Sequence, residues 1–597
     1  HRTKQEQDIS VWPDNPMGSG AEGAKFRFQW TYPILVSKYD PKTLYVTANV
    51  VFKSINEGMS WTQISGDLTR DDTSKLHSSG GPITKDNTSV EYYATIFTFA
   101  ESPVDKNVLW SGSDDGLVQV TKDGGASWQN VTPGDLPPWS MMSIIDASPY
   151  DPGTAYFAAN RYKLDDFTPY LFKTTDYGKS WKKIVNGIPE GEFTHVIRAD
   201  PNRKGLLYAG TERGIYCSFN DGESWQPLQI NLPVTPVHDI AIQAKEKDLI
   251  VATHGRAFWI LDDLTPIYQL NDKVVADEVH LFKPRDTYRI EAGSFERPGM
   301  AVGSNPPSGA LIYYYFKNKP KAKDSVKVDI LDSKGTLVKS FAGKSTKDDA
   351  PKDDNESDDN ENPTAPADSG MNRFIWNMHY PDAVKVPGAI MWAGTTDGPL
   401  AVPGTYQVRL TVAGKSWTEP FELKVDPRIT TSQADLQEQF DFLIKIRDKV
   451  TEADETVNNI RDIKKQTGDF VKKLDKQPYK KTVADSSKSL NDKLTKIENE
   501  IIQTKIKADE DALNFPIKLN DKIAGLIGVV SSADTKPTKQ SYDVYTELSA
   551  QLDAQIAKYK KVLETDLPAF DETVKKLDIP AVILKPSKES GGGTEKK

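Results

Sequence analysis

The chain has 597 residues and a formal net charge of −10, so three or four domains are expected and nucleic acid is not expected as a partner. A single cysteine, Cys217, excludes an intramolecular disulfide framework. The sequence holds no apolar run of about 20 residues, so no transmembrane segment is predicted, and no signal peptide is recognised.

An octamer occurs four times in the first part of the chain, with the pattern Ser/Thr, any, Asp/Asn, any, Gly, any, Ser, Trp. The copies are Ser54–Trp61, Thr121–Trp128, Thr174–Trp181 and Ser218–Trp225. The pattern predicts a tight turn, in which an Asp or Asn oxygen accepts backbone N–H groups, Gly takes positive φ and Trp is buried between repeats. These structural roles fall to Asn56, Gly58, Trp61, Asp123, Gly125, Trp128, Asp176, Gly178, Trp181, Asn220, Gly222 and Trp225.

Each octamer follows a Pro/Asp/Asn turn and a short strand of alternating apolar residues, at 37–48, 102–112, 148–159 and 199–210. A fifth stretch, 238–263, keeps the strand pattern without the octamer. We predict five four-stranded units over residues 1–266, as blades of a β-propeller. Because the chain starts with His and close to a repeat, we expect these units to be the C-terminal part of a larger propeller.

The octamers resemble Asp-box (bacterial-neuraminidase-type, BNR) repeats. The stretches 10–18, 80–96 and 252–264 are similar to those of secreted sortilin-like repeat proteins of bacteria, a group often labelled "glycosyl hydrolase". The resemblance implies a β-propeller and an extracytoplasmic location: secreted, periplasmic or on the outer surface. It leaves the function open, because the shared repeat is structural.

The remaining chain predicts a connector at 267–298 and an immunoglobulin-like β-sandwich at 299–428, where strand-like alternation returns. From their composition, an acidic insert at 347–362 and the tail 585–597 are expected to be disordered. From 429 to 584 the apolar period changes to 3.6 residues, which predicts a helical bundle or hairpin. Three apolar helix faces are expected, formed by Leu436, Phe440, Leu443, Val450, Ala453, Val457 and Ile460, by Leu490, Leu494, Ile497 and Ile501, and by Leu548, Leu552, Ile556, Tyr559 and Leu563.

A ligand site is expected on the propeller face opposite the octamer turns, where the turns between second and third strands meet the loops that link the blades. The resemblance to sialidase-like propellers indicates the same face. The predicted residues are Ser113, Asp114, Asp115, Asn160, Arg161, Glu212, Arg213, His254, Arg256, Tyr92 and Trp139, with Asn49, Asp86, Glu91 and Tyr93 beside them. The alternative is a solvated rim in which these charges pair with one another.

A catalytic constellation is not evident. Asp114 or Asp115 with Glu212 could supply the two carboxylates of a glycosidase, and Arg161, Arg213 and Arg256 could clamp a carboxylate, as in a sialidase. The Arg-Ile-Pro element of sialidases and other catalytic motifs are absent from the sequence, and the seven histidines lack metal-ligand spacing, so neither metal nor cofactor is predicted.

Two hypotheses follow. The first is a non-enzymatic binding or scaffold protein whose propeller face binds a peptide, glycan or partner protein within a larger extracytoplasmic assembly, one partner being an N-terminal fragment of the same precursor. The second is a glycoside hydrolase or lyase acting at the mouth of the propeller channel.

Overall fold

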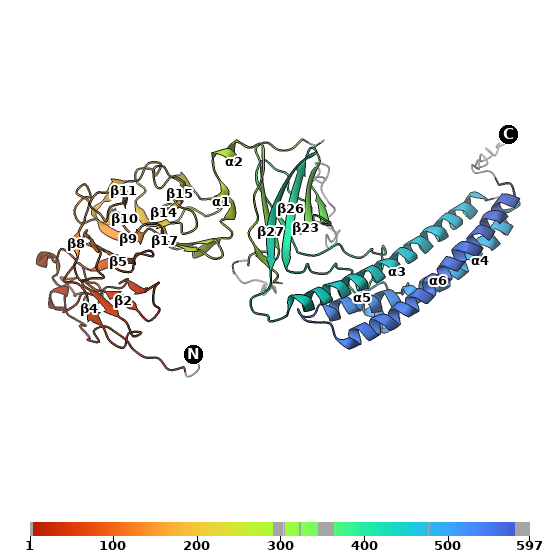
Figure 1. Cartoon of the computed structure of the whole chain (residues 1–597), viewed down its shortest axis with the longest axis horizontal. Helices are drawn as coiled ribbons and strands as arrows, with labels where there is room; N and C mark the ends of the chain where they lie inside the picture. The colour runs from red at the N-terminus through yellow and green to blue at the C-terminus, as the bar shows by residue number, and fades with distance from the viewer. Residues whose placement is uncertain are drawn as a thin grey trace, which may run out of the picture. The chain divides into compact units, whose positions relative to one another are not determined.

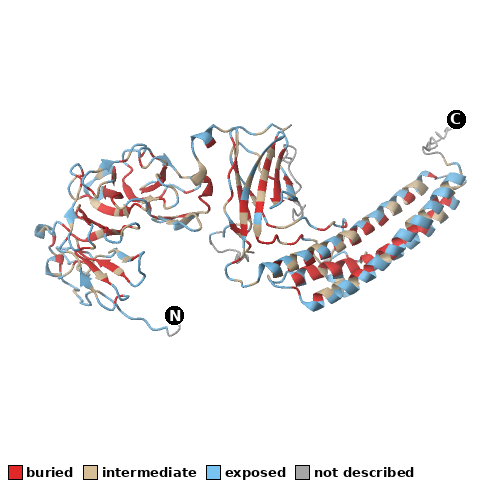
Figure 2. Cartoon of the chain, viewed as in Figure 1, coloured by how far each residue is buried: buried red, intermediate tan, exposed pale blue. Residues whose placement is uncertain are grey.

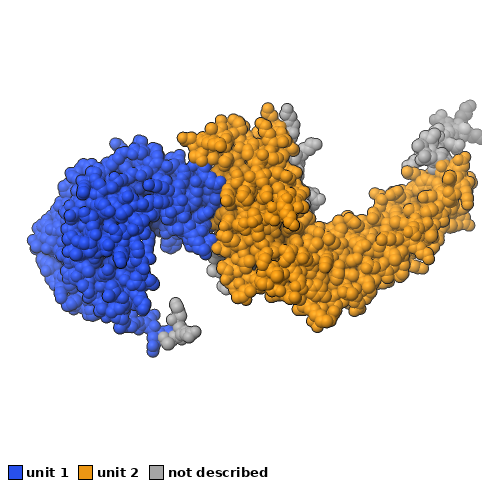
Figure 3. All heavy atoms as spheres, in the orientation of Figure 1, with its two compact units in different colours: residues 1–270 blue, residues 271–597 orange. Residues whose placement is uncertain are grey.

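The computed structural model describes residues 4–290, 303, 305–321, 324–343, 363–475 and 477–579. The chain divides into two compact units, His1–Leu270 and Asn271–Lys597 (Figure 3). It is mainly β with a C-terminal helical region, and its buried residues follow the strands and one side of each long helix (Figure 2). The predicted insert 347–362 and tail 585–597 lie outside the described residues.

The first unit is a series of small antiparallel sheets in which each strand pairs with its neighbour in sequence (Figure 1). The first four-stranded sheet holds β1 (Ile34–Val36), β2 (Leu44–Thr47), β3 (Val51–Ser54) and β4 (Thr62–Gln63), and the second holds β5 (Ile96–Glu101), β6 (Leu109–Ser113), β7 (Val118–Thr121) and β8 (Gln129–Asn130). The third holds β9 (Met141–Ala147), β10 (Ala155–Arg161), β11 (Asp166–Thr174) and β12 (Lys182–Lys183). The fourth holds β13 (Thr194–Ala199), β14 (Leu207–Thr211), β15 (Ile215–Ser218) and β16 (Gln226–Pro227). This meander is the pattern of a propeller blade.

The fifth sheet departs from the prediction. It has three strands, β17 (Val237–Gln243), β18 (Asp248–Thr253) and β19 (Phe258–Leu261), where the sequence predicts four. No octamer turn follows β19 to return the chain along its edge. Instead the chain enters the short helix α1 (Thr265–Gln269).

The octamers form the turns between the third and fourth strands, as predicted. In one turn the Thr174 hydroxyl donates to Asp176 Oδ1 (2.8 Å) and accepts from Gly178 N (2.9 Å), while Asp176 Oδ1 also accepts from Ser180 N (3.0 Å). The other three turns repeat this network with Asn56, Asp123 and Asn220. Because amide and carboxylate serve equally, these side chains are structural.

Three of the four octamers also hold the sheet before them. The Trp181 indole N–H donates to the Val131 carbonyl (2.6 Å), and a Cβ atom on Gly178 would lie 2.7 Å from the Val131 side chain. Trp128 bonds Ile64 (3.0 Å) and Trp225 bonds Ile184 (2.7 Å) in the same way, while Trp61 bonds Ile9 (3.0 Å). The octamer therefore fixes the turn and also the packing of one sheet on the next.

The burial predicted for the four indole rings holds for one of them. Trp225 is 5% exposed, whereas Trp61, Trp128 and Trp181 are only partly buried. Each ring directly precedes an exposed outer strand of two residues, and this is as true of Trp225 as of the other three. Trp225 differs in that its backbone N–H donates to the Asn186 carbonyl (2.8 Å) and its ring shares an apolar cluster with Ile184 and Ile188.

The first strands of neighbouring sheets pack together and are joined by an ion-pair chain. Arg198 on β13 contacts Asp146 on β9 (3.4 Å) and Asp239 on β17 (2.8 Å), and its Nε donates to the Ile240 carbonyl (3.0 Å). These bonds fix the relative positions of three first strands, on which part of the candidate site stands.

In the second unit, after α2 (Asp272–Ala276), two sheets share one apolar core that includes Tyr314, Phe341 and Trp376. One sheet holds β20 (Val279–Leu281), β22 (Ala310–Phe316) and β25 (Gly370–Trp376). The other holds β21 (Thr287–Tyr288), β27 (Lys415–Lys424), β26 (Gly404–Val412), β23 (Val326–Asp332) and β24 (Leu337–Ala342). The strands β22 to β27 lie where the alternating sequence predicts them, whereas β20 and β21 lie in the predicted connector 267–298 and belong to the two sheets because they pair with β22 and β27. The immunoglobulin type stays a prediction.

The helical region holds α3 (Gln433–Lys473), α4 (Lys480–Ile501), α5 (Leu519–Val530) and α6 (Lys539–Lys576) around one apolar core. The predicted faces of α3, α4 and α6 face this core, although Phe442 rather than Phe440 is the buried aromatic residue of α3. The helix α5 was not among the predicted helices. Its Asp521 carboxylate accepts from the backbone N–H groups of Trp392, Ala393 and Gly394, which attaches this helix to the loop after β25.

Candidate functional site

The strand pairing places the predicted turns at the end of the sheets opposite the octamers. In an antiparallel sheet, the hairpin between the second and third strands and the turn between the third and fourth strands lie at opposite ends of the strands. Ser113–Asp115, Asn160–Arg161, Glu212–Arg213 and His254–Arg256 occupy these hairpins. Ligand binding by this face stays a prediction, and its residues form separate groups rather than one cluster.

Asp114 and Asp115 are engaged within the protein. Asp114 accepts from the backbone N–H (2.9 Å) and the hydroxyl (2.8 Å) of Thr95. Asp115, with no exposed surface, accepts from the hydroxyl of Ser113 (2.5 Å) and from Arg70 N (2.8 Å). Burial raises the pKa of Asp114 to about 7 and also raises the pKa of Asp115. Both carboxylates stabilise the hairpin and the loops beside it.

An aromatic group lies next to this pair. Trp139, which has positive φ (63°), stacks with Tyr93 (ring centroids 6.4 Å apart), and the Arg70 guanidinium lies 5.1 Å from the Trp139 ring centre. Arg70 Nε donates to the Asp115 carbonyl (2.7 Å), which orients the guanidinium. A partly exposed indole, a tyrosine and an arginine therefore form a surface suited to contacts with a ligand.

Other residues of the predicted ligand-binding face are buried or paired within the protein, so they are less available to contact a ligand. Arg161 pairs with Asp166 (2.8 Å), and the amide of Asn160, which is 2% exposed, donates to the Thr194 carbonyl (3.3 Å). Tyr92 is 7% exposed and donates to the Ser19 carbonyl (3.2 Å). It borders a separate cavity of about 630 Å³ lined by N-terminal residues, among them Trp12.

A histidine group was missed by the sequence analysis. The His195 and His238 rings stack with centroids 4.1 Å apart, and the His254 ring lies 4.8 Å from that of His238. The Glu212 carboxylate lies 2.8 Å from His195 Nε2. The seven histidines lack metal-ligand spacing along the sequence, but the packing of β13 on β17 brings these three close together in space.

Burial favours the neutral form of the His195 and His238 rings. Burial lowers the pKa of His195, an effect that the Glu212 carboxylate opposes. Partial enclosure, together with His195 and His254, lowers the pKa of His238 to about 4. Aligning the sequence units by their first strands would have revealed the signal, since "THV" and "VHD" open β13 and β17.

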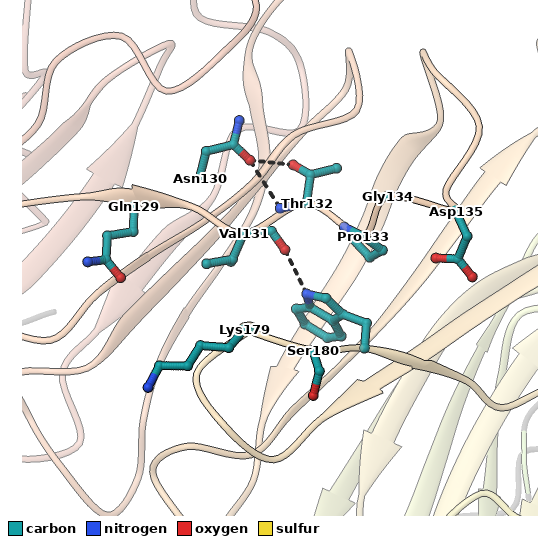
Figure 4. Close-up of a pocket in the computed structure, with 11 residues that line it drawn as sticks. Gln129, Asn130, Val131, Thr132, Pro133, Gly134, Asp135, Lys179 and Ser180 are labelled. Atoms are coloured by element: carbon teal, nitrogen blue, oxygen red, sulfur yellow. Dashed lines mark hydrogen bonds between the residues drawn. The ribbon is translucent and has the colours of Figure 1, made fainter.

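An open pocket of about 740 Å³ lies at the octamer end, outside the predicted face. It runs between residues 129–135 and the octamer loop of the next sheet, and its lining includes Lys179, Ser180 and Asp135 (Figure 4). Within it, the Val131 carbonyl accepts the Trp181 indole N–H. The pocket is thus a groove along the joint between two sheets.

No protein-family model matches the chain. The vacuolar protein sorting/targeting protein 10 of Colletotrichum graminicola is 30% identical over 118 residues, which are 19% of this chain and 7% of that protein. The chain therefore spans a small part of the length of this curated relative. Among the described residues, no helix is both long and apolar enough to cross a membrane.

Similar solved structures include an ancestral GH74 enzyme, at 15% identity and TM-score 0.30, covering 56% of this chain and 40% of that one. A GH74 xyloglucanase from Xanthomonas campestris has 13% identity and TM-score 0.30, covering 64% and 63%. YCF48 from Cyanidioschyzon merolae has 19% identity and TM-score 0.22, covering 28% and 52%. The chain spans less than two thirds of each of these proteins, and the strand pairing carries the evidence for propeller-type sheets.

Proposed function

We propose that the chain is a secreted or cell-surface, non-enzymatic binding or scaffold protein. Its binding surface is the face that carries the hairpins between second and third strands, and its ligand is a peptide, glycan or partner protein. The observation that carries this proposal is the engagement of the candidate carboxylates. Asp115 is fully buried, Asp114 is held by Thr95 and Glu212 faces His195, whereas a glycosidase needs two carboxylates facing one cleft.

The same face offers a contact surface. Trp139, Tyr93 and Arg70 form a ready-made group of the residue types that dominate binding energies at interfaces. Because Arg70 is oriented by Asp115, the group is ordered before a ligand arrives, which lowers the entropic cost of binding. The Asp115 carboxylate accepts from the Arg70 backbone N–H and the Asp115 backbone carbonyl accepts from Arg70 Nε, so both parts of Asp115 position the arginine.

The binding test is a pull-down from the secreted and membrane fractions of the source organism, with mass spectrometry of the recovered proteins. We expect stoichiometric partners with the native chain and at least about fivefold less recovery with Trp139→Ala. Trp392→Ala, which removes an indole 58% exposed in the other unit, is the matched control and should leave recovery unchanged. Equal recovery by the native chain and Trp139→Ala would contradict the proposal.

The second candidate function is glycoside hydrolysis. One observation favours it: a carboxyl whose pKa is raised to about 7, as for Asp114, is protonated at the pH where a general acid must donate. We expect the purified chain to release no reducing sugar from xyloglucan, the substrate named for one structural neighbour. Release that Asp114→Asn or Glu212→Gln abolishes, with thermal stability unchanged, would establish the hydrolase instead.

The resemblance of the octamers to Asp-box repeats supports an extracytoplasmic location, and the edges of the sheet series support a larger propeller. Ile34 and Val36 on β1 are 65% and 54% exposed, and Phe258 and Ile260 on β19 are 76% and 59% exposed. Apolar strands at both ends of the series are surfaces that further blades would cover. We propose that an N-terminal fragment of the same precursor supplies those blades.

A further inference from the structure

The histidine group arises from a repeated irregularity in the sheets. The first strand of each sheet from the second to the fifth has a one-residue shift in register near its start. The shifted residues are Phe97, Ser143, His195 and His238. A β-bulge re-aims its side chain out of the regular alternation, and bulges are common next to functional sites.

In three of these sheets, an equivalent residue of the hairpin between the second and third strands lies beside the bulge. Asp114, Glu212 and His254 each donate their backbone N–H to the residue just before a first strand: Thr95, Phe193 and Pro236. The fourth sheet therefore presents His195 with Glu212, and the fifth presents His238 with His254. The second sheet presents Phe97 with Asp114 at the same positions, so nitrogen ligands gather at one joint between two sheets.

We propose that His195, Glu212 and His238 bind a divalent transition-metal ion of the zinc class. One ligand atom from each, a ring nitrogen or a carboxylate oxygen, can be chosen so that all lie within 4.8 Å of one another. Ligands about 2 Å from a common ion lie closer together than this, so binding would require the side chains to rotate. Two imidazoles and one carboxylate favour zinc, cobalt, nickel or copper over calcium and magnesium, which prefer all-oxygen sites.

The surroundings hold the ligands in place. The Ser143 hydroxyl, from the bulge of the preceding sheet, donates to the His195 carbonyl (2.6 Å), and the Phe193 ring packs edge-on to the His195 ring (centroids 5.1 Å apart). His254 contacts the His238 ring. The His195 side chain is 8% exposed and that of Glu212 40%, and His238 is exposed, so the ion would be reached from solvent.

A three-ligand site leaves a coordination position for an outside group, as in zinc sites that act on a bound molecule. The ion would also join two sheets through ligands from each. This inference does not depend on the proposed binding function, because metal binding is measured without any other ligand.

The experiment is zinc titration of the chelator-treated full chain by calorimetry, with metal content determined after dialysis. We expect one zinc ion per chain, and at least about tenfold weaker binding by His238→Ala and by Glu212→Gln. Both side chains are at least partly exposed, so these variants should fold, and circular dichroism verifies this. Cobalt substitution should give visible absorption in the native chain that both variants lose.

The matched control is His77→Ala, because the His77 side chain is 73% exposed and, like His195, faces a glutamate, Glu22 at 2.7 Å. It should leave zinc affinity unchanged. Zinc should also raise the melting temperature of the native chain and of the control, and leave the double variant His238→Ala/Glu212→Gln unaffected. Absence of stoichiometric binding, or equal affinity of the double variant and the native chain, would overturn the proposal.

Discussion

Asp454 is a buried carboxyl with a single hydrogen-bond donor beside it. It lies on α3, has no exposed surface, and accepts from the Asn520 amide (3.2 Å). Burial raises its pKa to about 7 from 3.8. Between these two pH values the carboxyl is protonated in the folded protein and ionised in the unfolded chain. Its contribution to the free energy of unfolding is therefore complete below pH 3.8 and is lost as pH rises to about 7.

We therefore expect Asp454→Asn to become progressively more stable than the native chain as pH rises from 5 to 7. The difference in unfolding free energy should grow by up to about 1.4 kcal/mol per pH unit, because the amide carries no ionisation penalty. Urea unfolding followed by circular dichroism at 222 nm measures it. Asp485→Asn, at an exposed position of α4, is the control, and parallel pH profiles for the two variants would contradict the assignment.

At the scale of elements, the octamer turn is the part of the fold that the sequence predicts most completely. Its hydrogen bonds are local, spanning at most four residues, so the residue types alone specify them. The bond from Trp181 to Val131 joins residues of different sheets, and which residues meet in this way depends on packing that the local pattern does not encode. The same limit explains the missed site, because His195 and His238 meet only through packing of β13 on β17.

The difference in indole burial predicts a graded response. Trp225→Ala should lower the free energy of unfolding of the first unit by about 3–5 kcal/mol, because it removes a buried ring and leaves the Ile184 carbonyl without its donor. Trp61→Ala should lower it by less than half as much. Calorimetric unfolding measures both.

Trp225→Phe is the matched variant for Trp225→Ala, since it keeps most of the apolar ring and loses only the N–H donor. It should fall between the native chain and the alanine variant. A loss below about 1 kcal/mol for Trp225→Ala would contradict the role given to this ring in joining two sheets.

At the scale of the whole molecule, the apolar cores follow the two units. The cores of the two-sheet region and of the four helices are built from residues of the second unit alone. The change from strand-like to helix-like periodicity near residue 429 could be read from the sequence, as could the run of sheets before it. The helix α5 was missed because it is short and apolar over most of its length, so it lacks the wide polar face that marks the long helices.

We expect residues 271–597, expressed alone, to fold with the helix content that they have in the full chain. Their unfolding by urea, followed by circular dichroism at 222 nm, should give an unfolding free energy within about 0.5 kcal/mol of the value for the helical region in the full chain. The reason is that each unit has its own apolar core. Loss of the helical signal, or a midpoint clearly lower than in the full chain, would show that the units depend on each other.

The bonds from three octamer tryptophans to the sheet before them link the sheets in one direction along the chain. Ile64, Val131 and Ile184 are each held by the next sheet along the chain, whereas the equivalent Leu228 is followed by a sheet without an octamer. In that last sheet the Trp259 indole bonds the Arg256 carbonyl of its own hairpin (2.8 Å). The joint between the fourth and fifth sheets therefore lacks the tryptophan bond and depends on the contacts of Arg198 with Asp239 and the Ile240 carbonyl, and an ion held by His195, Glu212 and His238 would add a second link between the same two sheets.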